Sequence, residues 1–154
     1  MRRSLILLLM TIICTACSGA SEDKWTKQRP PTYPVSGTVN FNGTPLEGAT
    51  VVFQSTGAQT QAAVGRTDKE GHFQMRTFEE GDGAIAGEHS VAITCVKSEG
   101  PAEGTNLDEA DVVITETSLI PTVYGKAQKS GLNATVNPDQ ENTFIFELED
   151  KKQN

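Results

Sequence analysis

Polar and apolar residues alternate along much of the chain after residue 34, with the period of two that is typical of β-strands. The alternation is clearest over residues 35–41 and 143–148, where Val, Phe, Leu or Gly occupies every second position. Five further segments are predicted as strands, and turn sequences separate them: residues 49–53, 64–67, 72–78, 89–96 and 132–136. Asn42 and Gly43 close the first strand with a residue pair suited to positive φ. Seven short strands at this spacing predict a single all-β domain, a seven-stranded antiparallel β-sandwich.

One face of each predicted strand is apolar, and we expect these faces to meet between two sheets. No segment after residue 34 has the 3.6-residue period of a long amphipathic helix. The expected core residues are Val39, Phe41, Val51, Phe53, Phe73, Val91, Ile93, Phe144 and Phe146.

The first residues have a different pattern, because Arg2 and Arg3 precede an apolar run over residues 5–13. This run is shorter than the about 20 residues that a transmembrane helix needs. A basic head, an apolar run and then small residues indicate a secretory signal peptide over residues 1–16. Ala16 followed by Cys17 resembles the bacterial lipoprotein processing site, which implies that Cys17 is lipidated and becomes the N-terminus. An ordinary cleaved signal peptide, leaving Cys17 as a free thiol, is the alternative.

Residues 17–33 are small and charged and include two consecutive prolines, so we expect the lipidated Cys17 to be followed by a flexible linker. The folded domain is expected over residues 34–149, with a short tail over residues 150–154. A lipid anchor implies that the protein lies in the cell envelope, held to a membrane and facing the periplasm or the cell exterior.

Charge and composition exclude several classes of partner. The 154 residues contain 13 Lys and Arg against 20 Asp and Glu, a net charge of −7, whereas nucleic-acid binding needs a cationic face. Two His and three Cys leave little material for a His-rich or Cys-rich metal site. Only 6% of residues are aromatic, which disfavours the aromatic platforms on which sugars stack.

Four segments resemble the carboxypeptidase regulatory-like domain. They are VSGTV at residues 35–39, NGTPLEGATV at 42–51, TDKEGHF at 67–73 and AGEHSVAI at 86–93. The resemblance implies a transthyretin-like (prealbumin-like) Greek-key sandwich of seven strands. The whole chain is similar to small lipid-anchored bacterial proteins that carry this one domain.

Carboxylates in the predicted turns raise the question of a calcium site. Asp68, Glu70 and Asp82, with Glu88, are candidates to converge at one end of the sandwich. The segment around Asp68 is much shorter than a 12-residue EF-hand loop, and hairpin turns favour Asp and Gly for conformational reasons alone. We therefore expect no metal site and no cofactor.

A catalytic site is not expected either. His72 and His89 with Asp82 offer acid–base groups, but no nucleophile stands in a recognisable context. Cys95 is predicted to be a small buried core residue without a disulfide partner.

The leading interpretation is a non-enzymatic, lipid-anchored envelope protein, acting in scaffolding, adhesion or protein–protein binding at the membrane surface. Its partners would be the membrane, through the anchor, and an unknown envelope protein, but no nucleic acid. The alternative is a module that binds a small ligand, a glycan or calcium. The acidic segment of residues 98–118, which contains no Lys or Arg, is expected to be a surface excursion between strands.

Overall fold

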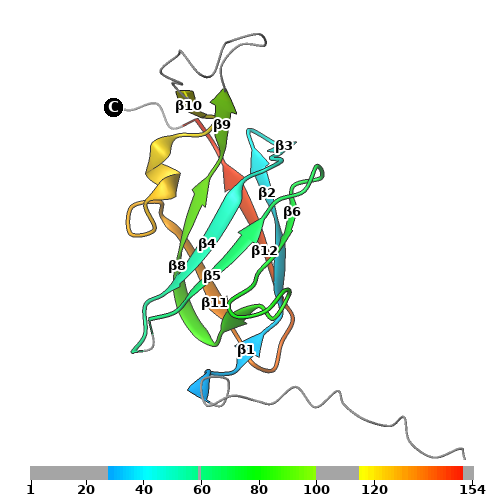
Figure 1. Ribbon diagram of the computed structural model, residues 1–154, viewed down its shortest axis with the longest axis vertical. Helices are drawn as coiled ribbons and strands as arrows, with labels where there is room; N and C mark the ends of the chain where they lie inside the picture. Colours follow the sequence, from blue (N-terminus) through cyan, green and yellow to red (C-terminus); the bar gives the residue numbers. More distant parts are fainter. Residues whose placement is uncertain (1–27, 59, 100–114, 151–154) are drawn as a thin grey trace, which may run out of the picture.

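The computed structural model describes residues 28–58, 60–99 and 115–150, which form an all-β fold with two larger sheets (Figure 1). The first sheet has the order β11 (Leu132–Val136), β8 (Gly87–Thr94), β4 (Thr50–Ser55) and β5 (Ala62–Arg66). In the second, β2 (Val35–Phe41) lies between β12 (Asn142–Leu148) and two short strands, β3 (Thr44–Pro45) and β6 (His72–Gln74).

Two small sheets lie at opposite ends of the long axis in Figure 1. One pairs β1 (Thr32–Tyr33) with β7 (Ala84–Ile85), and the other pairs β9 (Val96–Glu99) with β10 (Thr115–Ser118). A 3-10 helix, η2 (Thr122–Gly125), follows β10. Ile120 and Tyr124 are both buried, so this crossing segment is packed onto the domain.

The pairing of β12 with β2 is parallel, with Asn142 opposite Val35 and Leu148 opposite Phe41. All other strand pairs among the described residues are antiparallel. The expectation of a wholly antiparallel arrangement is therefore wrong at this pair. A hairpin forces two strands to run in opposite directions, but β2 and β12 are separated by most of the domain and no short turn constrains them.

The two larger sheets share one core. The ring of Phe53 from β4 makes edge contacts with Phe144 and Phe146 from β12, with centroid distances of 5.5 and 6.1 Å. Phe73 from β6 stacks on Phe146 at 6.2 Å. Edge-to-face geometry suits aromatic quadrupoles, so these rings join strands that are far apart in sequence.

Most of the expected core is confirmed. Two of the expected core residues, Phe41 and Phe144, are only partly buried and pack at its border. The core also contains buried apolar residues beyond that set, which lie outside the strands or at their ends: Met75, Ile85, Ile120, Tyr124, Val136 and Leu148.

The Asn-Gly turn is also confirmed. Asn42 and Gly43 have φ angles of 51° and 75° and join β2 to β3, as expected for a tight turn that needs positive φ at both central residues.

The folded part begins earlier than residue 34, because Thr32 and Tyr33 pair with Ile85 and Ala84. The boundary of the expected linker at residue 33 is therefore corrected. The predicted signal peptide and Cys17 lie outside the described residues, as do residues 151–154 of the tail. Of the acidic 98–118 segment, only the paired ends in β9 and β10 are described.

No helix within the described ranges is long and apolar enough to cross a membrane.

Replacing Phe53 by Ala should lower the free energy of unfolding by about 3 to 5 kcal/mol, because the fully buried ring contacts the opposite sheet. Ile145→Ala is the control, since Ile145 is 69% exposed on β12 and should change stability by no more than about 0.5 kcal/mol. Urea unfolding of both variants measures the difference. Equal costs would show that the two sheets do not share this core.

Candidate functional site

An open groove of about 800 Å³ lies on the outer face of β2, β6 and β12, bounded by β5. A second hollow of about 430 Å³ adjoins it and shares Ser36 and Gln74 with it. The two hollows therefore lie side by side. The residues that line them are mostly of polar type: Ser36, Thr38, Arg66, Asp68, His72, Gln74, Arg76, Glu80 and Thr143 in the first hollow, and Gln140, Glu141 and Asn142 in the second.

The floor of the groove follows from the alternation of β2. Val35 and Val39 point into the core, so Ser36 and Thr38 lie on the outer face. The antiparallel register places Gln74 opposite Ser36 and His72 opposite Thr38. His72 Nδ1 and Thr38 Oγ1 are 3.1 Å apart, within hydrogen-bonding distance.

The wall of the groove forms where β5 of the first sheet meets the chain that follows β6 of the second. Val64 and Arg76 exchange two backbone hydrogen bonds, of 2.8 and 2.9 Å. A Cβ atom on Gly65 would lie 2.7 Å from the carbonyl oxygen of Gln74 and 2.8 Å from Met75 Sδ. Only glycine fits this approach, so Gly65 allows the two sheets to join along one side.

Two arginines line this wall. Arg76 Nη1 lies 3.8 Å from Glu80 Oε2, with both side chains largely exposed, which makes a weak ion pair. Arg66 forms no ion pair within the part of the chain that the structure describes. Its charge nevertheless acts on a buried neighbour: burial raises the pKa of the Cys95 thiol, and Arg66 partly opposes this rise.

Asp68 at the end of the groove organises the turn before β6. Its Oδ1 accepts hydrogen bonds from the backbone N–H groups of Glu70 and His72, at 3.0 and 2.8 Å. This carboxylate therefore has the turn-forming role that the sequence indicated.

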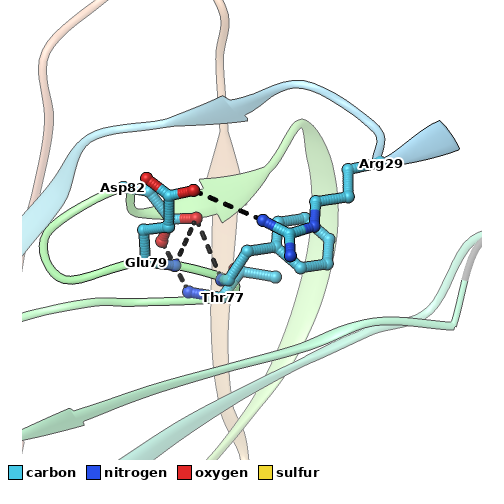
Figure 2. Close-up of polar contacts among 5 residues, drawn as sticks. Arg29, Thr77, Glu79 and Asp82 are labelled. Carbon is cyan, nitrogen blue, oxygen red and sulfur yellow. Dashed lines mark hydrogen bonds and ion pairs between the residues drawn. The ribbon is translucent and has the colours of Figure 1, made fainter. Parts of the chain in front are cut away.

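Asp82 has a similar role in the loop that follows β6 (Figure 2). Its two oxygens accept hydrogen bonds from the backbone N–H groups of Thr77, Phe78 and Glu79, at 2.6, 2.9 and 3.1 Å. These bonds hold the chain in a closed loop, which explains why the strand predicted over residues 72–78 ends at Gln74.

Arg29 fastens the beginning of the described chain to this loop. Its Nη1 lies 3.3 Å from Glu79 Oε1 (Figure 2). Its guanidinium lies 5.1 Å from the centroid of the Phe78 ring. A guanidinium over an aromatic face is attracted by the ring quadrupole.

The structure does not bring the candidate calcium ligands together. Asp68 and Asp82 each bind the backbone of their own loop, and Glu70 is exposed. Across residues 28–58, 60–99 and 115–150, no three His, Cys, Asp or Glu side chains gather in a way that holds a metal ion.

The two histidines lie in different environments. His72 is exposed in the groove, whereas His89 is 2% exposed and packs beside Phe53 at 5.8 Å between ring centroids. His89 Nε2 lies 2.9 Å from the carbonyl oxygen of Ile85, while its Nδ1 is buried without a hydrogen-bond partner among the described residues. Because His89 is buried in the core and His72 is exposed, the acid–base grouping of His72, His89 and Asp82 is not formed.

Cys95 is buried, as expected.

Nothing in the local sequence distinguishes Arg66 and Arg76. Both lie at exposed positions, where an isolated arginine carries no distinguishing signal. What brings them into one groove is the contact between β5 and the chain after β6, which no local pattern encodes.

No protein-family model matches the sequence, and no curated protein matches it. A comparison with solved structures finds a 9R-lipoxygenase from Cyanothece PCC8801, which is 14% identical with a TM-score of 0.34. The match covers 79% of this chain but only 17% of the lipoxygenase chain. A match of this kind carries no argument about fold or activity.

The expectation that the protein is not an enzyme is withdrawn: the structure found in this comparison is that of an enzyme, and a match this weak neither supports nor excludes an activity here. The expectation is not carried forward. The weakness of the match also means that it assigns no activity to this chain.

Replacing Asp82 by Ala should lower the free energy of unfolding by about 1 to 3 kcal/mol, because three backbone N–H groups lose their acceptor. Glu80→Ala removes the same charge from the same loop, but its side chain is 92% exposed, so this control should have little effect. Thermal unfolding should give the same difference in EDTA and in calcium. A midpoint that rises with calcium in the wild type but not in Asp82→Ala would instead make Asp82 a metal ligand.

Proposed function

We propose that this protein is a lipid-anchored protein of the cell envelope whose β-domain binds a partner protein at the membrane surface. As part of this proposal, the all-β domain is a seven-stranded Greek-key sandwich of the carboxypeptidase regulatory-like, transthyretin-like type. The four motifs that carry this resemblance support it.

The sequence around Cys17 supports the anchor. If Cys17 is the lipidated N-terminus, residues 18–28 connect it to the first residues fastened to the domain, at Arg29. Eleven extended residues span at most about 40 Å. The end of the domain that carries β1 would then face the membrane, and the end with β9 and β10 would point away from it (Figure 1).

The observation that supports partner binding is the groove on β2, β6 and β12. It is open to solvent, whereas sites for small ligands are mostly enclosed. The groove runs beside strands that lie along the long axis of the domain, so a partner can approach it from the side of an anchored molecule (Figure 1).

Cys17→Ser tests the anchor. Without the thiol no lipid can be attached, so we expect the variant to move from the detergent phase to the aqueous phase, or to remain unprocessed. Detergent phase partition of cells that express each form measures this, with Cys95→Ser as the matched control. Identical partition of wild type and Cys17→Ser into the aqueous phase would contradict the lipoprotein assignment.

Thr143→Tyr tests the groove. Thr143 is exposed on β12 opposite Ser36, so the added ring would fill the depression without entering the core. Cross-linking and pull-down of the anchored protein from envelope extract should lose the partner in this variant.

Thr135→Tyr is the matched control for this experiment, because Thr135 is exposed on β11 of the other sheet, outside the groove. It should retain the partner. Loss in both variants, or in neither, would contradict a binding role for the groove.

A further inference from the structure

We propose that the outer edge of β12 binds a second copy of this chain, so that two β12 strands pair antiparallel about a two-fold axis at Ile145. This inference goes beyond the proposed function, because it concerns the edge of the sheet and not the groove. The direction of the backbone groups, the symmetry of the side chains and a half-buried ring carry it.

β12 is the last strand of its sheet, and among the described residues it pairs only with β2. On the side of β2, the carbonyl oxygen of Leu148 accepts a hydrogen bond of 2.8 Å from the backbone N–H of Asn42. The backbone N–H and C=O of the next residue, Glu149, both bond instead to the hydroxyl of Tyr124. Even-numbered residues of β12 therefore direct their backbone groups toward β2, and odd-numbered residues direct theirs away from it.

Three residues of β12 consequently direct an N–H and a C=O outward: Thr143, Ile145 and Glu147. These six groups have no hydrogen-bond partner within the described part of the chain. In an antiparallel pair centred on Ile145, that residue exchanges both of its bonds with its own copy. Thr143 does the same with Glu147 of the second copy, and the reverse pair repeats this, so all six groups of each chain are satisfied.

The side chains around Ile145 have the same two-fold symmetry. Residues 143–147 read TFIFE, with Phe on both sides of Ile145 and polar residues beyond them. The pairing places Phe144 opposite Phe146 of the second copy, and the hydroxyl of Thr143 opposite the carboxylate of Glu147. The two Glu147 side chains are then four residues apart along the strands, about 13 Å, which exceeds the screening length of about 8 to 10 Å. No like charges therefore oppose each other within this segment.

The second copy would also cover apolar surface that β12 leaves in contact with water. Ile145 is 69% exposed, and Phe144 is only partly buried at the border of the core. Opposite side chains in a non-hydrogen-bonded pair lie about 4.5 to 5.5 Å apart, so the second copy would shield the exposed part of the Phe144 ring. β12 contains no Lys, no Pro and no bulge, which are the features that protect many natural edges from pairing.

The contact is small, so we expect the association to depend on protein concentration. Its hydrogen-bonded part has three residues a side, whereas standard interfaces have about 20 to 30. Beyond that part, the same register would bring the exposed Glu141 toward Glu149 of the second copy. These carboxylates repel each other, so added salt should strengthen the association.

Cysteine cross-linking of the full chain tests the register. Antiparallel strands turn the β1 ends of the two copies in opposite directions, so detergent is used, in which no membrane fixes their orientation. Ile145→Cys should form a disulfide-linked dimer under mild oxidation, because hydrogen-bonded partners have Cα atoms about 5.5 Å apart. Thr143→Cys and Glu147→Cys should each give no more dimer than the wild type, because like positions are about 13 Å apart. Mixing these two variants should produce the dimer.

A charge exchange tests the axis. Ile145→Lys and Ile145→Glu should each weaken association at least about fivefold in sedimentation over a series of protein concentrations, because like charges then face each other. An equal mixture of the two should recover it, because opposite charges face each other. Thr135→Lys adds the same charge to an exposed position on β11 of the other sheet and should leave association unchanged.

Three results would overturn the proposal. The first is an Ile145→Cys dimer no stronger than the wild-type background, and the second is equal cross-linking of Thr143→Cys alone and in the mixture. The third is association that Ile145→Lys leaves intact. A disulfide from Ile145→Cys to a different protein in envelope extract, without the dimer, would assign this edge to a strand of another partner and would also contradict pairing between two copies.

Discussion

The parallel pairing of β12 with β2 is the constraint on which the remaining structure depends. It aligns the last described strand with the first long one over seven residues and brings Phe144 and Phe146 against Phe53 of the opposite sheet. Since β2 also pairs with β3 and β6, the second sheet is assembled around this one strand. The core and the outer face with the groove both follow from the two faces of β2.

The groove exists because the two sheets also meet on the side of β5. The bridge between Val64 and Arg76 draws these chains together, and Gly65 is the residue that lets them approach. The outer face therefore continues from one sheet onto the other, and Arg66 and Arg76 lie beside the polar residues of β2 and β6. A groove formed in this way needs no specialised loop.

The two turn aspartates that raised the question of a calcium site have a structural explanation. Asp68 and Asp82 each replace the missing backbone partners of a turn, accepting hydrogen bonds from two and three N–H groups. Unpaired backbone N–H groups are costly when they are shielded from water, so a short acceptor at these positions stabilises the loop. Near the Asp82 loop, Arg29 stacks on Phe78 and ties the start of the domain to it.

The sequence by itself determined where the longer strands lie and which of their faces are apolar. It did so at Val39, Phe53 and Ile93, because alternation and turn residues are local properties that short segments express alone. The same reasoning found the Asn42–Gly43 turn and the role of Asp68. It also expected Phe144 to be buried, but the position at the border of the core leaves that ring partly exposed.

Only the tertiary structure decided which strands and side chains from distant parts of the sequence lie next to each other. The parallel direction of β12, the bridge across Gly65 and the burial of His89 each depend on contacts between distant segments. For the same reason, the sequence alone gave no indication that the exposed residues Arg66 and Arg76 belong to one site. They became a candidate site because long-range strand pairing, which a period of two does not encode, placed them on one face of the molecule.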